Sequence, residues 1–112
     1  MKRVMAIIKP FKLDDVKAAL QAIGVQGATL TQAHGHARHR GHTEHYRGTE
    51  YRAEFSPATQ LELLVEDHHV DGVVNAIVMS ARTGDLGDGK VIVQSIEDVV
   101  RIRTGEVGPA AL

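Results

Sequence analysis

The two halves of this 112-residue chain share one pattern, and that pattern limits the folds open to it. In each half a short apolar run precedes apolar residues at helical spacing and then a glycine. The matching pairs are Ile7–Ile8 with Leu64–Val65, Leu13–Asp14 with Val70–Asp71, Val16 with Val73, Ala19 with Ala76, Leu20 with Ile77, and Gly27 with Gly84. Two β-α-β units with right-handed crossovers form a four-stranded sheet with both helices on one face. We therefore expect an α+β, ferredoxin-like βαββαβ sandwich, with residues 1–112 as one domain.

Periodicity places the individual elements of this fold. Strands are expected at residues 4–8, 28–34, 60–66 and 91–94, from short apolar or β-branched runs. Helices are expected after Leu13 and around Val70–Ile77, with Asp67 as the N-cap of the second. Residues 96–103 are expected to form a turn and strand, and residues 104–112 a flexible tail. The sheet face away from the helices lacks a cover, so we expect further subunits to provide it.

Composition excludes several classes of function. The formal net charge is −1, which argues against nucleic-acid binding through bulk charge, and the expected central strands carry no aromatic residue for stacking on bases. No cysteine is available for a disulfide or a thiolate metal site. No apolar run approaches the roughly 18 residues of a membrane span, and no signal-peptide core is recognisable. We expect a cytoplasmic protein without direct membrane insertion.

A glycine-rich stretch predicts a site for phosphate groups. Its glycines and cations are Gly84, Gly87, Gly89, Lys90, Arg101 and Arg103. Glycine allows backbone N–H groups to approach an anion closely, and the cations supply opposing charge. The spacing from Gly84 to Lys90 also fits a P-loop, but Val91 stands where that motif needs Ser or Thr. A phosphate cradle of another kind is favoured over a plain glycine-rich turn, which remains the alternative.

The segment between the second and third strands is the longest without periodicity. It runs from Gly35 to Pro57 and contains Tyr46, Tyr51 and Phe55. Structureless loops longer than about 12–15 residues in compact domains are usually functional or disordered. The three aromatic residues favour protein-partner binding over a tolerated insertion.

Four motifs in order resemble the PII nitrogen-regulatory signal-transduction proteins over essentially the whole chain. They are Ile7–Leu20, Gly41–Tyr51, Ala81–Lys90 and Arg101–Glu106. The resemblance implies a homotrimer that binds ATP or ADP in clefts between subunits, with Mg²⁺ as a further ligand. It also implies a T-loop, here about residues 36–57, that docks on a protein partner such as a membrane transporter or an enzyme. Members of this family are regulators and not enzymes.

The resemblance also implies a set of nucleotide-binding residues. Gly87 and Gly89 offer amides to the phosphates, Lys90, Arg101 and Arg103 neutralise them, and Arg103 comes from the neighbouring subunit. The implied set is Ile7, Thr29, Gly35, Arg38, Glu62, Leu64, Gly87, Asp88, Gly89, Lys90, Arg101 and Arg103. Tyr51 aligns with a tyrosine that is nucleotidylated in some members, although an unmodified contact tyrosine is the favoured interpretation.

Two departures from the family pattern bear on 2-oxoglutarate. His39 stands where members have the glutamine that coordinates Mg²⁺, and Ala58 where they have a lysine that contacts the dicarboxylate. A small dicarboxylate needs directed cationic partners, and alanine supplies none. We therefore expect regulation without normal 2-oxoglutarate sensing.

A histidine cluster supports an alternative function. His36, His39, His42 and His45 lie within the expected T-loop and are candidate ligands for Zn²⁺ or Cu²⁺. The alternative is a metal-responsive relative linked to metal efflux, or a relative that senses bicarbonate and adenylates. A solvated polar loop is the simpler interpretation of these histidines, and His68–His69 are expected to be plain surface residues.

Overall fold

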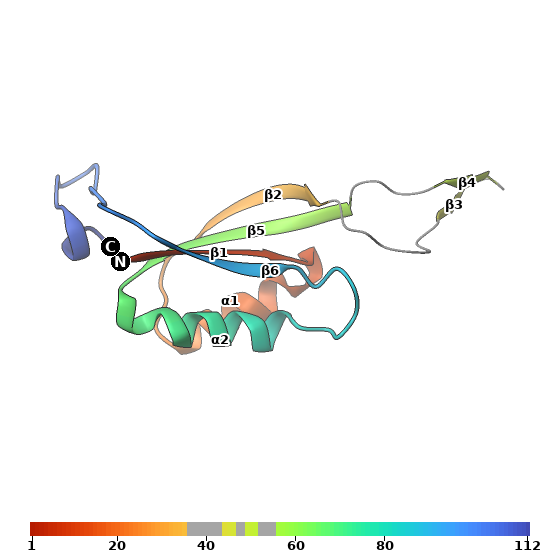
Figure 1. Cartoon of the computed structure of the whole chain (residues 1–112), viewed down its shortest axis with the longest axis horizontal. Helices are drawn as coiled ribbons and strands as arrows, with labels where there is room; N and C mark the ends of the chain where they lie inside the picture. Colours follow the sequence, from red (N-terminus) through yellow and green to blue (C-terminus); the bar gives the residue numbers. More distant parts are fainter. Residues whose placement is uncertain (36–43, 47–48, 52–55) are drawn as a thin grey trace.

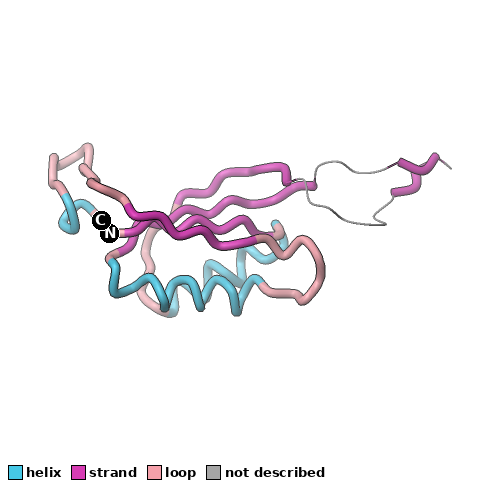
Figure 2. The backbone as a smooth tube through the Cα atoms, in the orientation of Figure 1, coloured by secondary structure: helices cyan, strands magenta, loops and turns pink. Residues whose placement is uncertain are grey.

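The computed structural model describes residues 1–35, 44–46, 49–51 and 56–112. Its main sheet contains β1 (Lys2–Ile8), β2 (Thr29–Gly35), β5 (Ser56–Val65) and β6 (Lys90–Ser95), in the order β2-β5-β1-β6. Every neighbouring pair in this sheet is antiparallel. Helices α1 (Leu13–Ala22) and α2 (Val70–Ala81) lie side by side on one face of the sheet (Figures 1 and 2). The predicted ferredoxin-like arrangement is therefore confirmed.

Short elements complete the described chain. A second, two-stranded sheet pairs β3 (Glu44–Tyr46) with β4 (Thr49–Tyr51) inside the long segment between β2 and β5. Single 3₁₀ turns form at η1 (Pro10–Lys12), η2 (Asp67–His69) and η3 (Gly108–Ala111). Among the described residues, no helix combines the length and apolarity needed to cross a membrane.

The core lies between the sheet and the two helices. Alternate residues of β1 and β5 point into it, as period-two alternation requires. Helices α1 and α2 add a stripe from successive turns. The buried apolar residues are Val4, Ala6, Ile8, Val16, Leu20, Leu61, Leu63, Val65, Val73, Ile77 and Ala81. Neither helix covers the opposite sheet face, which is left without a cover by the described residues (Figure 2).

Strand β5 begins earlier than the sequence predicts, at Ser56 rather than Gln60. The extension contains Pro57. Proline is normally excluded from a central strand, because it has no backbone N–H to donate to a neighbouring strand. At Pro57 the strand pairs only with His34 of β2, since pairing with β1 starts at Thr59. Proline is therefore tolerated where β5 projects beyond β1.

Two local expectations differ from the structure. Asp67 is not the N-cap of α2; it lies in η2, and its carboxylate accepts a 2.8 Å hydrogen bond from the Met1 ammonium group. Residues 96–103 form no strand, and only a single antiparallel bridge joins Val100 to Val107. The expected flexible tail, residues 104–112, includes η3, and its mobility stays a prediction.

Candidate functional site

The register of the sheet brings several predicted nucleotide-binding residues onto the uncovered face. Thr29 of β2 lies opposite Glu62 of β5, and Ile7 of β1 lies between Gln60 and Lys90 on its two neighbours. Leu64 pairs with Arg3 and is 42% exposed. Directly paired residues point to the same face of a sheet, so these side chains share one surface.

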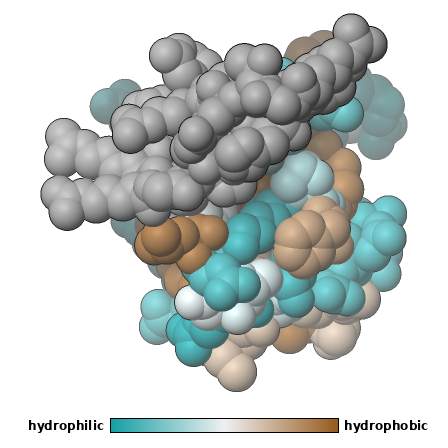
Figure 3. Space-filling model, turned by 90° about the vertical axis from the view of Figure 1, so that its right-hand side faces the viewer, coloured by the Kyte–Doolittle hydropathy of each residue, from teal (hydrophilic) through white to brown (hydrophobic). Residues whose placement is uncertain are grey.

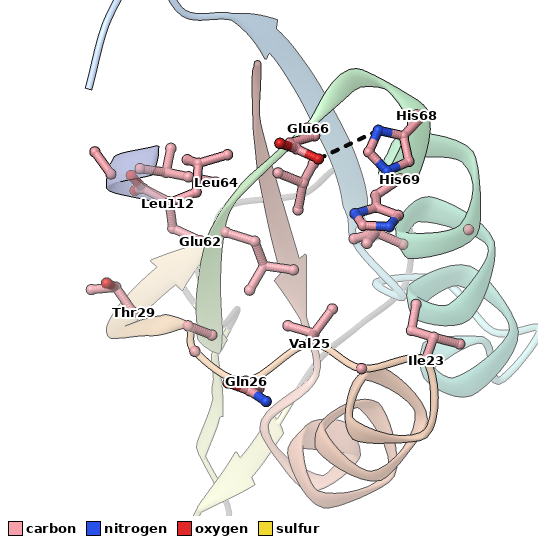
Figure 4. A pocket seen from close by; sticks show the side chains of 18 residues that line it. Ile23, Val25, Gln26, Thr29, Glu62, Leu64, Glu66, His68, His69 and Leu112 are labelled. Carbon is pink, nitrogen blue, oxygen red and sulfur yellow. Dashed lines mark ion pairs between the residues drawn. The ribbon is translucent and has the colours of Figure 1, made fainter. Parts of the chain in front are cut away.

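A pocket of about 730 Å³ opens where this surface meets the turn after α1 (Figure 4). Thr29, Glu62 and Leu64 line it together with residues 23–28, and Leu112 closes another part of its wall. Apolar side chains such as Ile23, Val25 and Leu64 are mixed here with a few polar ones. A large, mainly apolar concavity with few polar groups is the usual form of a small-molecule site.

Glu62 is held by an arginine inside this surface. Arg3 donates from Nη2 to Glu62 Oε2 at 2.9 Å and from Nη1 to Gln94 Oε1 at 3.0 Å, so it spans three strands. The hydrogen bond from Arg3 lowers the pKa of Glu62 and keeps the carboxylate charged. Arg3 Nε is buried, and no hydrogen-bond partner is found for it among the described residues. Glu62 therefore reaches a ligand only as a carboxylate that is already paired.

The glycine-rich stretch forms the connection from α2 to β6. Gly84, Gly87 and Gly89 have φ angles of 90°, 87° and 92°, a region that favours glycine. A Cβ atom on Gly89 would lie 1.6 Å from the carbonyl oxygen of Ile7, so no side chain fits there. The backbone at Gly89 therefore passes directly over the end of β1.

Asp88 closes this loop on itself. Its Oδ2 accepts hydrogen bonds from the backbone N–H groups of Thr83, at 2.9 Å, and Gly84, at 3.0 Å. Its Oδ1 accepts from the Thr83 hydroxyl and lies 3.2 Å from Lys9 Nζ. The hydrogen bonds from Thr83, with smaller contributions from Gly84 and Lys9, hold the pKa of Asp88 far below its ordinary value. In this structure the Asp88 carboxylate stabilises the conformation of its own loop.

Lys90 starts β6 immediately after this loop. It is exposed, and no ion pair is found for it within residues 1–35 and 56–112. Ile7, Asp88, Gly89 and Lys90 line a second, smaller pocket of about 180 Å³. An exposed ammonium group beside a glycine-rich backbone is suited to a phosphate group.

Arg101 and Arg103 lie at the other end of the molecule. β6 pairs Lys90 with Ile7 at one end of the sheet and Ser95 with Lys2 at the other, and the chain then continues away from the loop (Figure 1). Arg101 donates to Glu106 Oε1 at 3.1 Å and to the Leu112 carbonyl at 2.8 Å. One chain therefore does not bring either arginine to Lys90.

The end of the molecule that carries the glycine-rich loop also receives the end of β2 and the start of β5, since Gly35 pairs with Ser56. Viewed from that end, hydrophilic residues and separate hydrophobic patches alternate on the visible surface (Figure 3). Arg38, His36, His39 and His42 lie outside the described residues. His45 and Tyr51 belong to the backbone pairing of β3 with β4, and their side chains are outside the description.

Sequence reasoning missed three residues that shape this region: Arg3, Lys9 and Thr83. The alternation of β1 could have identified Arg3, because a residue directly before the buried Val4 must face away from the core. Thr83 carries a weaker signal, since short polar side chains beside glycine often bond their own loop. For Lys9 the sequence offers no signal, because its partner Asp88 is distant along the chain.

Comparison with known proteins gives a consistent result. A family model described as "Nitrogen regulatory protein P-II" matches residues 1–106. A protein of that name from Rhizobium etli is 57% identical over 112 residues, which is 100% of each chain. Proteins of the same name from Mesorhizobium japonicum and Rhodospirillum rubrum are each 54% identical over 112 residues, again covering 100% of both chains.

Proposed function

The chain belongs to the nitrogen regulatory protein P-II family, and from this premise we propose that it binds ATP or ADP between the subunits of a homotrimer. Membership places it among signalling regulators rather than enzymes. In this proposal the bound nucleotide changes the segment 36–57, the T-loop, and so changes how a protein partner is engaged. Such a switch works by differential affinity of the nucleotide for the loop states.

One observation carries this proposal: the phosphate-side groups of a single chain lie at opposite ends of its sheet. Lys90 and the Gly87–Gly89 backbone are at one end, and Arg101 and Arg103 are beyond the other. A triphosphate chain is too short to reach both ends of one subunit. A second copy that presents its C-terminal arginines to the first copy's loop gives a complete set of cations.

The uncovered sheet face supports the same arrangement. It carries Ile7, Thr29 and Leu64 beside the pair Arg3–Glu62, and no helix of the described chain covers it. An exposed sheet face with apolar side chains marks a contact surface. In the homotrimer that we propose, adenosine contacts residues of this face while its phosphates reach Gly87, Gly89 and Lys90.

A subunit-mixing experiment tests the shared site. Lys90→Ala and Arg103→Ala chains should each bind ATP weakly as pure trimers, because every site then lacks one cation. In trimers assembled from an equal mixture, the subunit that supplies Lys90 to a site has an intact lysine in about half of the cases. The neighbour that supplies Arg103 has an intact arginine in about half of the cases, so about a quarter of the sites should recover. Calorimetric stoichiometry measures the recovery. Mixed trimers that recover no sites, although each variant alone is trimeric, would show that Lys90 and Arg103 belong to the same subunit's site.

The protein partner is proposed to be a transporter or an enzyme, met in the cytoplasm by the T-loop. A metal-responsive function through His36, His39, His42 and His45 has no support from the described residues, which exclude most of that cluster. We therefore retain nucleotide-dependent regulation as the proposed function.

A further inference from the structure

Three side chains with metal-binding donors meet at the start of α2, away from the glycine-rich loop. Glu66 directly follows the last residue of β5, and His68 and His69 belong to the η2 turn that comes next. One donor atom from each residue lies within 4.8 Å of the others. Glu66 Oε2 is 3.5 Å from His68 Nδ1, and the two imidazole centroids are 3.9 Å apart (Figure 4).

We propose that Glu66, His68 and His69 form a binding site for a divalent transition-metal ion, best matched by Zn²⁺. Two imidazoles and one carboxylate are a ligand set that Zn²⁺ uses in sites with an open fourth position. Tetrahedral coordination with bonds of about 2.1 Å places donor atoms about 3.4 Å apart. The Glu66–His68 separation already matches that spacing, and His69 needs only a modest side-chain movement to join it.

The side chains are free to make that movement. His69 is exposed, and the side chains of His68 and Glu66 are 66% and 42% exposed, so rotation about their side-chain bonds meets little packing. The 3₁₀ turn η2 keeps the three side chains close together, because the chain between β5 and α2 is tightly coiled there and not extended. Binding therefore requires ordering of rotamers rather than refolding of the backbone.

The local charge is compatible with a cation. The start of a helix carries partial positive charge, which opposes a metal ion, although the effect is small at an exposed position. Glu66 supplies a direct negative ligand, and Asp71 in the first turn of α2 adds a second carboxylate nearby. Asp67 lies between Glu66 and His68 in the chain, but its carboxylate is engaged by the Met1 ammonium group at 2.8 Å.

The fourth coordination position of the proposed metal ion would face a pocket. Glu66, His68 and His69 all line the pocket of about 730 Å³ that also contains Thr29, Glu62 and Leu64 (Figure 4). A three-ligand site at the wall of a pocket leaves its fourth position for water or for an anionic donor. This metal site is distinct from the histidines of the T-loop, and it does not depend on the proposed nucleotide function.

Zn²⁺ titration of the metal-stripped full chain tests the site. We expect one Zn²⁺ per chain that depends on these residues. The Zn²⁺ affinity should fall at least about tenfold in each of the variants His68→Ala, His69→Ala and Glu66→Gln, since even outer-shell partners of metals contribute about 10–100-fold. Co²⁺ in place of Zn²⁺ should give the visible absorption bands of a four-coordinate ion, and those bands should fade in the same variants.

Matched variants separate this site from other histidines. His34→Ala removes an exposed histidine outside the cluster and should leave the uptake unchanged. A variant with His36, His39, His42 and His45 all replaced by alanine should also retain it. Circular dichroism without metal checks that every variant is folded. The proposal is overturned if wild type takes up no Zn²⁺, or if the uptake survives loss of both His68 and His69.

Discussion

The backbone of Gly89 lies so close to the end of β1 that a Cβ atom would come within 1.6 Å of the Ile7 carbonyl oxygen. This contact fixes how the loop after α2 enters β6, and with it the place of Lys90. Gly84 provides a natural comparison: its φ of 90° is nearly the same as the 92° of Gly89, yet a Cβ there meets nothing within 4 Å.

Gly89→Ala should therefore be more destabilising than Gly84→Ala. Both variants place alanine at positive φ, which costs about 1–2 kcal/mol. Only Gly89→Ala adds a clash with backbone, which forces the loop to move and should also weaken ATP binding. Urea unfolding at one protein concentration measures the difference. Equal losses of stability in the two variants would contradict the close approach of Gly89 to Ile7.

Asp88 should make the loop's stability depend on pH. Its folded pKa is depressed, chiefly by the Thr83 hydroxyl and the Thr83 and Gly84 amides, so the charged form favours the folded loop. The contribution is fully present above the ordinary value of about 3.9 and is lost as pH falls through the lowered folded pKa.

Stability measured between neutral and acid pH, for wild type and Asp88→Asn, tests this sign. Wild type should be the more stable protein near neutral pH, and the gap should narrow as the solution becomes acidic below about pH 4. Asp85→Asn is the matched control, because no hydrogen bond or ion pair of its carboxylate is found among the described residues. A gap that widens toward acid would refute the role of the Asp88 carboxylate.

The centre and the edge of the helix-covered sheet face should respond differently to the same truncation. Leu61 of β5 is 1% exposed, whereas its register partner Leu30 of β2 is 47% exposed. Leu61→Ala should lower the free energy of unfolding by about 2–5 kcal/mol, because it leaves a cavity. Leu30→Ala should cost less than about 1 kcal/mol, since the side chain is only half removed from water. Denaturant titration of both variants at the same protein concentration compares them.

Alternation and helical spacing were sufficient to predict the sheet, both helices and the core face. Val4, Ala6 and Ile8 alternate as a half-buried strand must, and Val73 and Ile77 recur as one helical stripe. The bridge from Val100 to Val107 is a single pair without alternation, so no periodicity identifies it. The early start of β5 was missed because Pro57 excludes a central strand, and sequence does not show where β1 ends beside it.

For the candidate site, the sequence offers residue types but not their geometry. Glycine-rich spacing identifies a loop that can approach an anion, yet it does not show that Gly89 faces Ile7 or that Asp88 bonds Thr83. Adjacent histidines are typical of an exposed surface, and only the η2 turn brings the donors of His68 and His69 near Glu66. Each of these relationships depends on how the backbone folds in three dimensions, and local sequence patterns do not show that.

Removing Arg101 or Arg103 should weaken the binding of ATP and ADP at least about tenfold, because in the proposed site each variant would lose a charge-assisted contact to phosphate. Arg101 has a second role, since it also holds Glu106 and the Leu112 carbonyl. Glu106→Gln weakens that local pair while keeping the guanidinium, and it should leave nucleotide affinity within about threefold. Unchanged calorimetric affinity in Arg101→Ala and Arg103→Ala would refute the assignment of these arginines.

2-Oxoglutarate should leave the affinity of the wild-type chain for ATP unchanged. Ala58 stands in β5 directly opposite Ala33 of β2, so neither residue of that pair carries a cation for a carboxylate. The resemblance places a lysine at position 58 and a glutamine at position 39 in members that bind this dicarboxylate. His39→Gln with Ala58→Lys should therefore create ATP-dependent uptake, and Ala33→Lys is the matched control for added charge. Calorimetry with and without ATP measures both, and strong ATP-dependent uptake by wild type would show that His39 and Ala58 suffice for 2-oxoglutarate.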